Sequence, residues 1–173
     1  AIAENPPKTF REAMQLHYFI FVGLFIEGNA GGYSPGRMDQ NLYPYYKRDV
    51  EAGILTDADA LELIECMWIK FGEQIWYWNE PAATHYAGFC AFQNVCIGGV
   101  DMDGLDAVNP LSYLMLQVTI DTQMVQPSLS VRLSRKNPED FFLKIAELIQ
   151  TGSGFPAIYS DDIGMKQLMK KGI

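Results

Sequence analysis

The sequence predicts an α/β protein with a helical N-terminal half and a C-terminal half in which strands and helices alternate. Apolar residues recur at helical spacing through most of the chain up to about residue 75, and the pattern breaks around 76–83. From residue 89 on, short apolar or alternating runs are separated by helix-opening signals, in the order strand–helix–strand–helix–strand–helix. Right-handed crossovers make three such strands parallel. There is no internal repeat or long linker, so residues 1–173 are expected to form a single segment.

Three helices are predicted in the N-terminal half. Thr9 and Glu12 have the spacing of a capping box, which opens the first helix. A loop rich in turn-forming residues follows at 29–36, and then a short helix at 43–52. Thr56 caps a longer helix, whose apolar residues recur at steps of three and four and therefore share one buried face.

Three strands and three helices are predicted in the C-terminal half. The strands are expected at 89–100, 128–133 and 155–159. The helices between and after them are expected at 110–123, 138–152 and 163–171. Asn109-Pro110 and Asn137-Pro138 each place a capping Asn before a Pro at the first helical position, a pattern typical of helix starts.

The strand at 128–133 has two chemically different faces. The apolar face is formed by Leu129, Val131 and Leu133. The polar face is formed by Ser128, Ser130 and Arg132. The apolar face is expected to meet helices, because the apolar set must take the covered side of the sheet. A parallel sheet covered on both faces is apolar on both, so the polar face needs its own explanation. Buried polar groups need partners, and a cavity holding a polar substrate would provide them. The alternative is an edge strand whose polar residues lie in water, and the pattern alone leaves both open.

Composition excludes several classes of protein. With 49% hydrophobic and 20% charged residues, a packed core is expected rather than disorder. The formal net charge of -8, without a cluster of Lys and Arg, argues against nucleic acid and anionic membrane as partners. The most apolar run, 18–26, is too short to span a bilayer and predicts a buried helix.

The cysteines and histidines show no metal-ligand spacing, so no metal site is expected. The three cysteines are Cys66, Cys90 and Cys96. An odd number fits a reducing cytosol, so we expect a cytoplasmic protein with inert core thiols. His17 is expected to pack within its hydrophobic helix, whereas His85 has no assigned role. The aromatic run at 76–78 would line a pocket for an aromatic substrate or belong to the core.

Two groups of sequence blocks carry a family resemblance. The first is SPGRMDQNLYPYY at 34–46, followed by Asp49 and by LELIECMWIK at 61–70. The second comprises FQNVCIGGV at 92–100, NPLSY at 109–113, QPSLSVR at 126–132 and GFPA at 154–157. In this order the blocks resemble the glycyl radical enzymes of the pyruvate formate-lyase-like superfamily. The resemblance covers nearly the whole chain.

This resemblance implies a ten-stranded β/α barrel of two parallel half-barrels, of which the chain is the central part. Two loops meet inside such a barrel: one carries a cysteine, and the other a glycine that a radical S-adenosylmethionine activase converts to a glycyl radical. Radicals of this kind need a closed, dry cavity. Neither the Gly-Cys-x-Glu block nor the RVxGY-like block of those loops occurs in this sequence. We therefore expect no catalytic residue, metal or organic cofactor in this chain.

The resemblance further implies an anaerobic lyase or dehydratase that is a homodimer at full length. Its expected partners are a small polar substrate, the activating enzyme and the remainder of the barrel. The segment 160–172 resembles choline and isethionate lyases, which favours radical elimination of a group beside a carbon that bears a hydroxyl or an amine.

Several residues of these blocks are candidates for binding or structure. Arg37 and Asp39 are expected to hold their loop through a charge-assisted hydrogen bond. The candidate substrate-binding residues are Gly31, Gly32, Phe92, Asn94, Ser128, Ser130 and Arg132. Arg132 would bind a carboxylate or sulfonate, or else pair with an acidic residue of the protein.

The two glycines occupy the positions of a His-Ser pair in glycerol dehydratase-like members, which argues against glycerol-type diol recognition. They would admit a larger substrate or a neighbouring backbone, or simply form a tight turn.

Two classes of function remain open at this point. The chain is either an internal fragment of a radical lyase or dehydratase, or a non-catalytic truncated relative that acts as a binding or assembly module. An unrelated α/β enzyme would leave the ordered blocks unexplained. An open half-barrel would expose strand edges and apolar faces, so the isolated chain is expected to be marginally soluble or to self-associate.

Overall fold

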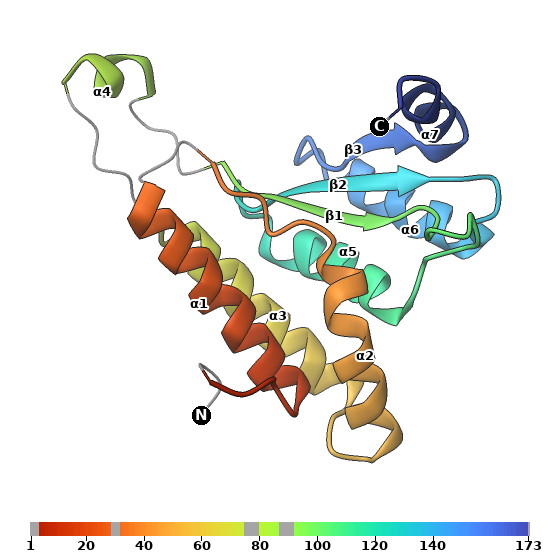
Figure 1. Cartoon of the computed structure of the whole chain (residues 1–173), viewed down its shortest axis with the longest axis horizontal. Coiled ribbons are helices and arrows are strands. Elements are labelled where there is room, and N and C mark those ends of the chain that lie inside the picture. The colour runs from red at the N-terminus through yellow and green to blue at the C-terminus, as the bar shows by residue number, and fades with distance from the viewer. Residues whose placement is uncertain (1–3, 29–31, 75–79, 87–91, 173) are drawn as a thin grey trace.

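The computed structural model of the protein describes residues 4–28, 32–74, 80–86 and 92–172. Within them the predicted class is confirmed, with helices in the first half and parallel strands alternating with helices in the second (Figure 1). The first four helices are α1 (Phe10–Gly28), α2 (Met38–Glu51), α3 (Asp57–Gly72) and α4 (Glu80–Tyr86). They are followed by β1 (Asn94–Gly98), α5 (Pro110–Thr122), β2 (Ser128–Leu133), α6 (Glu139–Gln150), β3 (Ala157–Ser160) and α7 (Asp161–Lys170).

The three strands form one parallel sheet in the order β1-β2-β3. Asn94 of β1 lies opposite Ser128 of β2. The segment before α2 runs parallel to β1, with bridges from Gly32 to Phe92 and from Gly36 to Val95. It therefore covers the outer edge of β1, whereas all four residues of β3 are exposed.

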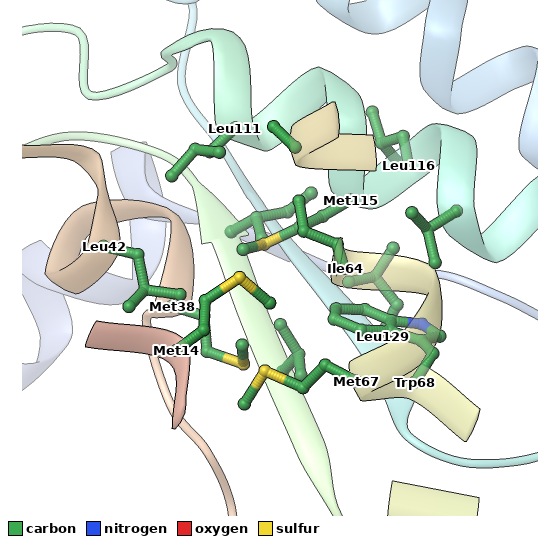
Figure 2. Close-up of a cluster of buried hydrophobic side chains, with 14 of the residues drawn as sticks. Met14, Met38, Leu42, Ile64, Met67, Trp68, Leu111, Met115, Leu116 and Leu129 are labelled. Carbon is green, nitrogen blue, oxygen red and sulfur yellow. The ribbon is translucent and has the colours of Figure 1, made fainter. Parts of the chain in front are cut away.

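Helices cover one face of the sheet, and the core lies between them and the strands. Figure 2 shows side chains of α1, α2, α3 and α5 gathered around Leu129 of β2. Leu129 and Val131 are buried in this core, and Leu133 packs against it. The predicted apolar face of the middle strand therefore meets the helices.

Two of the predicted helix starts differ in their capping. Asn109 caps α5 as predicted, since its side chain accepts a hydrogen bond from the Leu111 N–H. The prediction that Asn137 caps α6 is wrong, because α6 begins at Glu139 with Pro138 at the capping position and no side-chain cap. The Asn137 amide is instead used to join neighbouring loops, as described below.

Other boundaries shift by a few residues. Helix α2 begins at Met38, five residues before the predicted start at residue 43, and it includes Pro44. At the start of α1, Thr9 Oγ1 accepts from the Glu12 N–H at 3.2 Å, as a capping box requires. The Glu12 carboxylate, however, accepts from the Lys8 N–H at 2.7 Å, so the second half of the box is displaced by one residue.

The expectation of buried, inert thiols holds for neither described cysteine in full. Cys66 is exposed on α3, and Cys96 is half-buried on β1, where burial raises the pKa of its thiol. Cys90 and the aromatic run 76–78 lie outside the described residues. His17 is half-buried on α1 and burial lowers its pKa, while the ring of His85 contacts the Pro81 carbonyl one turn earlier in α4. In the part of the chain that the structure describes, no helix is long and apolar enough to cross a membrane.

Candidate functional site

The face of the sheet opposite the core carries a polar ladder, formed by Asn94, Ser128, Ser130 and Arg132. Ser130 donates its hydroxyl hydrogen to Asn94 Oδ1 at 2.8 Å. Ser128 donates to the Gln93 carbonyl at 2.9 Å and lies 3.3 Å from the same Asn94 oxygen. The polar groups of neighbouring strands thus satisfy one another, which explains how this face is tolerated with Ser130 only 3% exposed.

The donors of the Asn94 amide remain available. Both serine contacts use Asn94 Oδ1, and in the described residues the amide nitrogen donates no hydrogen bond. The two serine oxygens also keep lone pairs that accept hydrogen bonds. This end of the ladder therefore presents donors and acceptors to a polar molecule outside the sheet.

Gly32 and Phe92 lie together at the same end of the ladder, joined by a parallel bridge. A Cβ on Gly32 would approach the Phe92 carbonyl oxygen to 2.7 Å, so glycine is required here by the neighbouring backbone. Of the three alternatives for this glycine, close approach of a neighbouring backbone is what the structure shows. The Phe92 side chain is 49% exposed. Gly31 lies outside the described residues.

Arg132 stands at the opposite end of the ladder. It pairs with Gly98, whereas Ser128 pairs with Asn94, so about 13 Å of strand separates the two positions. Arg132 Nε donates to Asp161 Oδ1 at 2.7 Å. The guanidinium is therefore engaged by an acidic residue of the protein, the second of the two roles that the sequence left open.

The carboxyl end of β1 forms what we call the glycine turn, Gly98, Gly99 and Val100. Both glycines have positive φ angles, 72° and 77°. Arg37 donates to the carbonyl of Gly98 and, at 3.2 Å, to that of Val100. Asp39 Oδ2 accepts from the Gly98 N–H at 2.8 Å. Arg37 and Asp39 therefore do hold structure through charge-assisted hydrogen bonds, but they bind the turn rather than their own loop.

Asp39 is the most deeply buried acidic residue of this region, with no exposed surface. Its Oδ2 also accepts from the Ser112 hydroxyl at 2.8 Å, and its carbonyl accepts from the Asn109 amide at 3.2 Å. Burial raises the pKa of the Asp39 carboxyl, against the opposing effect of the hydrogen bonds from Gly98 and Ser112. Gln40 donates to the Ala107 carbonyl at 2.7 Å. This motif thus joins α2 to the end of β1 and the start of α5.

Two further side chains at the turn were missed by the sequence reasoning. Asp161 Oδ2 accepts from the Val100 N–H at 2.8 Å. Asn137 Nδ2 donates to the Gly99 carbonyl at 2.8 Å and to Asp106 Oδ1 at 2.7 Å. The available signal was position: both residues follow parallel strands, whose carboxyl ends meet at one edge of the sheet.

Among the described residues, no group of three or more His, Cys, Asp or Glu could hold a metal ion. A cavity of about 550 Å³ lies on the helical side, and no ladder residue lines it. Its wall is built by Thr9, Arg11, Asp49, Ile54, Leu55, Asp59, Glu62, Leu63 and Cys66. The ladder and the glycine turn are the candidate site, because there the sheet brings predicted binding residues of two strands together.

Comparison with known proteins places the chain among enzymes of one family. Residues 1–173 match the family described as Pyruvate formate lyase-like. The chain is 36% identical over 179 residues to trans-4-hydroxy-L-proline dehydratase of Clostridioides difficile, an alignment that covers 99% of this chain and 22% of that protein. It is 39% identical over 173 residues to isethionate sulfite-lyase of Bilophila wadsworthia, covering 99% of this chain and 21% of that protein.

A solved structure, described as concerning 1,2-propanediol dehydration in Roseburia inulinivorans, has the same fold over this region. It superimposes with a TM-score of 0.92 at 36% identity, covering 100% of this chain and 22% of that one. The chain therefore spans about a fifth of the length of these relatives.

Proposed function

Because this chain belongs to the pyruvate formate lyase-like family of glycyl radical enzymes, we propose that it is the central part of a radical lyase or dehydratase. The proposed reaction eliminates a group from a small polar substrate. The observation that carries the proposal is the polar ladder, whose serines are satisfied within the sheet while the Asn94 amide donors have no partner among the described residues. The opposite face of the same strands is sealed by the core, which keeps water away from that side.

We propose that the ladder lines the interior of a ten-stranded barrel completed by the rest of the longer protein. The loops that bear the reactive cysteine and glycine belong to that remainder, since this sequence has no block of either type. The glycyl radical, installed by an activase, supplies hydrogen abstraction. The residues of this chain bind and orient the substrate and exclude water.

The residues proposed to line the substrate site are Gly31, Gly32, Phe92, Asn94, Ser128, Ser130 and, at the opposite end of the ladder, Arg132. Asn94 donates to a substrate oxygen, and the serine oxygens accept from a substrate hydroxyl. The exposed Phe92 ring provides an apolar wall beside them. Because Arg132 is paired with Asp161, it acts here as an oriented donor rather than as a free positive charge.

The proposal includes a cytoplasmic, anaerobic enzyme that is a homodimer at full length and depends on an activating enzyme. Two of the relatives act on trans-4-hydroxy-L-proline and on isethionate, as their names state. The similar solved structure concerns the dehydration of 1,2-propanediol. These compounds share a small carbon skeleton with a polar group, which is the class that the ladder suits.

The test uses the full-length protein that contains this chain, activated without oxygen by a radical S-adenosylmethionine activase. We expect a glycyl radical doublet in the electron paramagnetic resonance spectrum and turnover of at least one compound from a panel of isethionate, trans-4-hydroxy-L-proline, 1,2-propanediol and glycerol. A full-length protein with neither radical nor turnover would instead be a binding or assembly module.

A further inference from the structure

We propose that Asp161 is a positioning residue for the reaction assigned above, and that it acts by joining the exits of β1 and β2 at the end of the polar ladder. The inference rests on the proposed function. Asp161 does not belong to the ladder, and the sequence blocks did not single it out as a binding residue. Its effect on the reaction passes through Arg132 and the glycine turn.

The two carboxylate oxygens of Asp161 serve two different strands. Oδ1 accepts from Arg132 Nε at 2.7 Å, and Oδ2 accepts from the Val100 N–H at 2.8 Å. The side chain of Asp161 is 7% exposed and that of Arg132 is 21% exposed. A partly buried ion pair with this geometry holds its partners in one arrangement more firmly than an exposed pair does.

The same carboxylate also explains why residue 99 is a glycine. A Cβ at this position would lie 2.3 Å from Asp161 Oδ2 and 2.7 Å from Arg132 Cβ. Distances of this size exclude any side chain unless the ion pair moves. Glycine is therefore required at 99 both for its φ angle of 77° and for the approach of Asp161.

The first turn of α7 is fixed by Asp162 as well. Its Oδ1 accepts from the Ser134 hydroxyl at 2.8 Å, and its Oδ2 accepts from the Arg135 N–H at 3.1 Å. The two neighbouring aspartates thus bind the exits of β1 and β2 at once. Negative charge is also favourable at this end of a helix.

The consequence is a defined end to the ladder. Arg132 is turned toward Asp161 and the Val100 carbonyl, at 2.7 and 3.5 Å, and the glycine turn cannot move without breaking these contacts. In an enzyme of the proposed type, a displacement of about 1 Å between substrate and reacting groups costs on the order of 10²-fold in rate. Asp161 therefore affects turnover without touching the substrate.

The decisive variant is Asp161→Asn in the activated full-length enzyme. The two donors reach different carboxylate oxygens, and Asn replaces one of these oxygens with an NH₂ group, so either Arg132 or Val100 loses its acceptor. We expect kcat, normalised to the number of glycyl radicals, to fall on the order of 10²-fold, with KM changed less than about threefold. Hydrogen exchange of the peptide containing Val100 should become faster. Radical content itself should match that of the unmodified enzyme.

The matched control is Asp140→Asn, which removes a carboxylate from the first turn of α6. Asp140 accepts from the Tyr113 hydroxyl at 2.7 Å on the surface and has no contact with the glycine turn. This variant should leave kcat and the exchange of the Val100 peptide unchanged. An equal loss in both variants would show that charge at a helix start, and not the joined strand exits, is responsible.

Coupling gives a second test that does not depend on Asp161→Asn folding well. The kcat values of Asp161→Asn, Arg132→Gln and the double variant are compared in a double-mutant cycle. The kcat of the double variant should lie no more than about threefold below that of the less active single variant. Effects that multiply, or an Asp161→Asn enzyme with unaltered kcat and exchange, overturn the inference. An unmodified enzyme without radical or turnover overturns the proposed function instead. Even then, unaltered hydrogen exchange of the Val100 peptide in Asp161→Asn would show that Asp161 does not join the exits of β1 and β2.

Discussion

Two acid–arginine pairs hold the glycine turn from opposite sides, and they do so differently. On the β1 side, Asp39 receives both of its side-chain hydrogen bonds, from Gly98 and Ser112, on a single oxygen. On the β3 side, Asp161 distributes its two bonds over both oxygens. The first pair does not bond to each other, whereas Arg132 and Asp161 form an ion pair. The comparison teaches that one anchor collects its donors on a single oxygen, whereas the other needs both oxygens and an ion pair.

The largest effect is expected for Asp39→Ala. The substitution leaves the Gly98 N–H and the Ser112 hydroxyl without a partner in a site with no solvent exposure. At roughly 1–3 kcal/mol for each unsatisfied group, the free energy of unfolding should fall by about 2–6 kcal/mol. Thermal or urea unfolding of the full-length protein measures it.

Asp39→Asn sharpens the same comparison. One amide oxygen accepts from both donors, so this variant should be far milder than Asp39→Ala, whereas Asp161→Asn must lose a bond. Equal losses of stability for Asp39→Asn and Asp39→Ala would show that the charge of Asp39, rather than its single accepting oxygen, holds the turn.

Gly99→Ala should be the next most damaging change. It combines the strain of a positive φ angle with a 2.3 Å approach of the new Cβ to Asp161 Oδ2. Gly36→Ala is the matched control, because Gly36 has φ 75° but nothing within 4 Å of the added Cβ. Strain alone costs about 1–2 kcal/mol, and Gly99→Ala should exceed this. Equal destabilisation by the two variants, measured by thermal unfolding, would mean that the carboxylate yields easily.

A smaller change is expected at the far end of the ladder. Asn94→Leu removes the acceptor of the Ser130 hydroxyl together with the donors of the Asn94 amide. A polar partner left unsatisfied in this way costs about 1–3 kcal/mol. In the activated enzyme kcat/KM should fall about 5- to 150-fold, with radical content preserved. Asn41→Leu, on the exposed face of α2, is the control. An Asn94→Leu enzyme with full activity would remove the ladder from the site.

The smallest effect concerns pH, and the two sides should differ in sign. Burial raises the pKa of Asp39 above its ordinary value of 3.8, so the stability it contributes should fall as pH rises from 3.8 through the raised pKa. Hydrogen bonds from Arg135 and Ser134 lower the pKa of Asp162, so its contribution is present above 3.8 and is lost as pH falls through the lowered pKa. Unfolding measured against pH in Asp39→Asn and Asp162→Asn should remove these opposite slopes.

The sequence by itself determined most of the elements, their alternation and the family, although the short helix α4 was not predicted. The strand at 128–133 could be predicted because side chains alternate strictly across a strand. The helix start at Asn109-Pro110 could be predicted because a capping side chain binds the backbone two or three residues further on. The same local logic failed for Asn137, whose amide binds Gly99, 38 residues away, rather than its own helix. Local signals decide an element but not a choice between local and distant partners.

Only the tertiary structure decided what the polar residues bind. Arg132 meets Asp161 across 29 residues of sequence, and Asp39 meets Ser112 across 73. Nothing in their spacing predicts these pairs, because the carboxyl ends of parallel strands meet only once the crossovers have brought the strands side by side. Gly32 is a further case, since its need for glycine arises from the Phe92 backbone that lies against it. Periodicity follows from the geometry of one chain segment, whereas partner choice follows from which segments come to lie together.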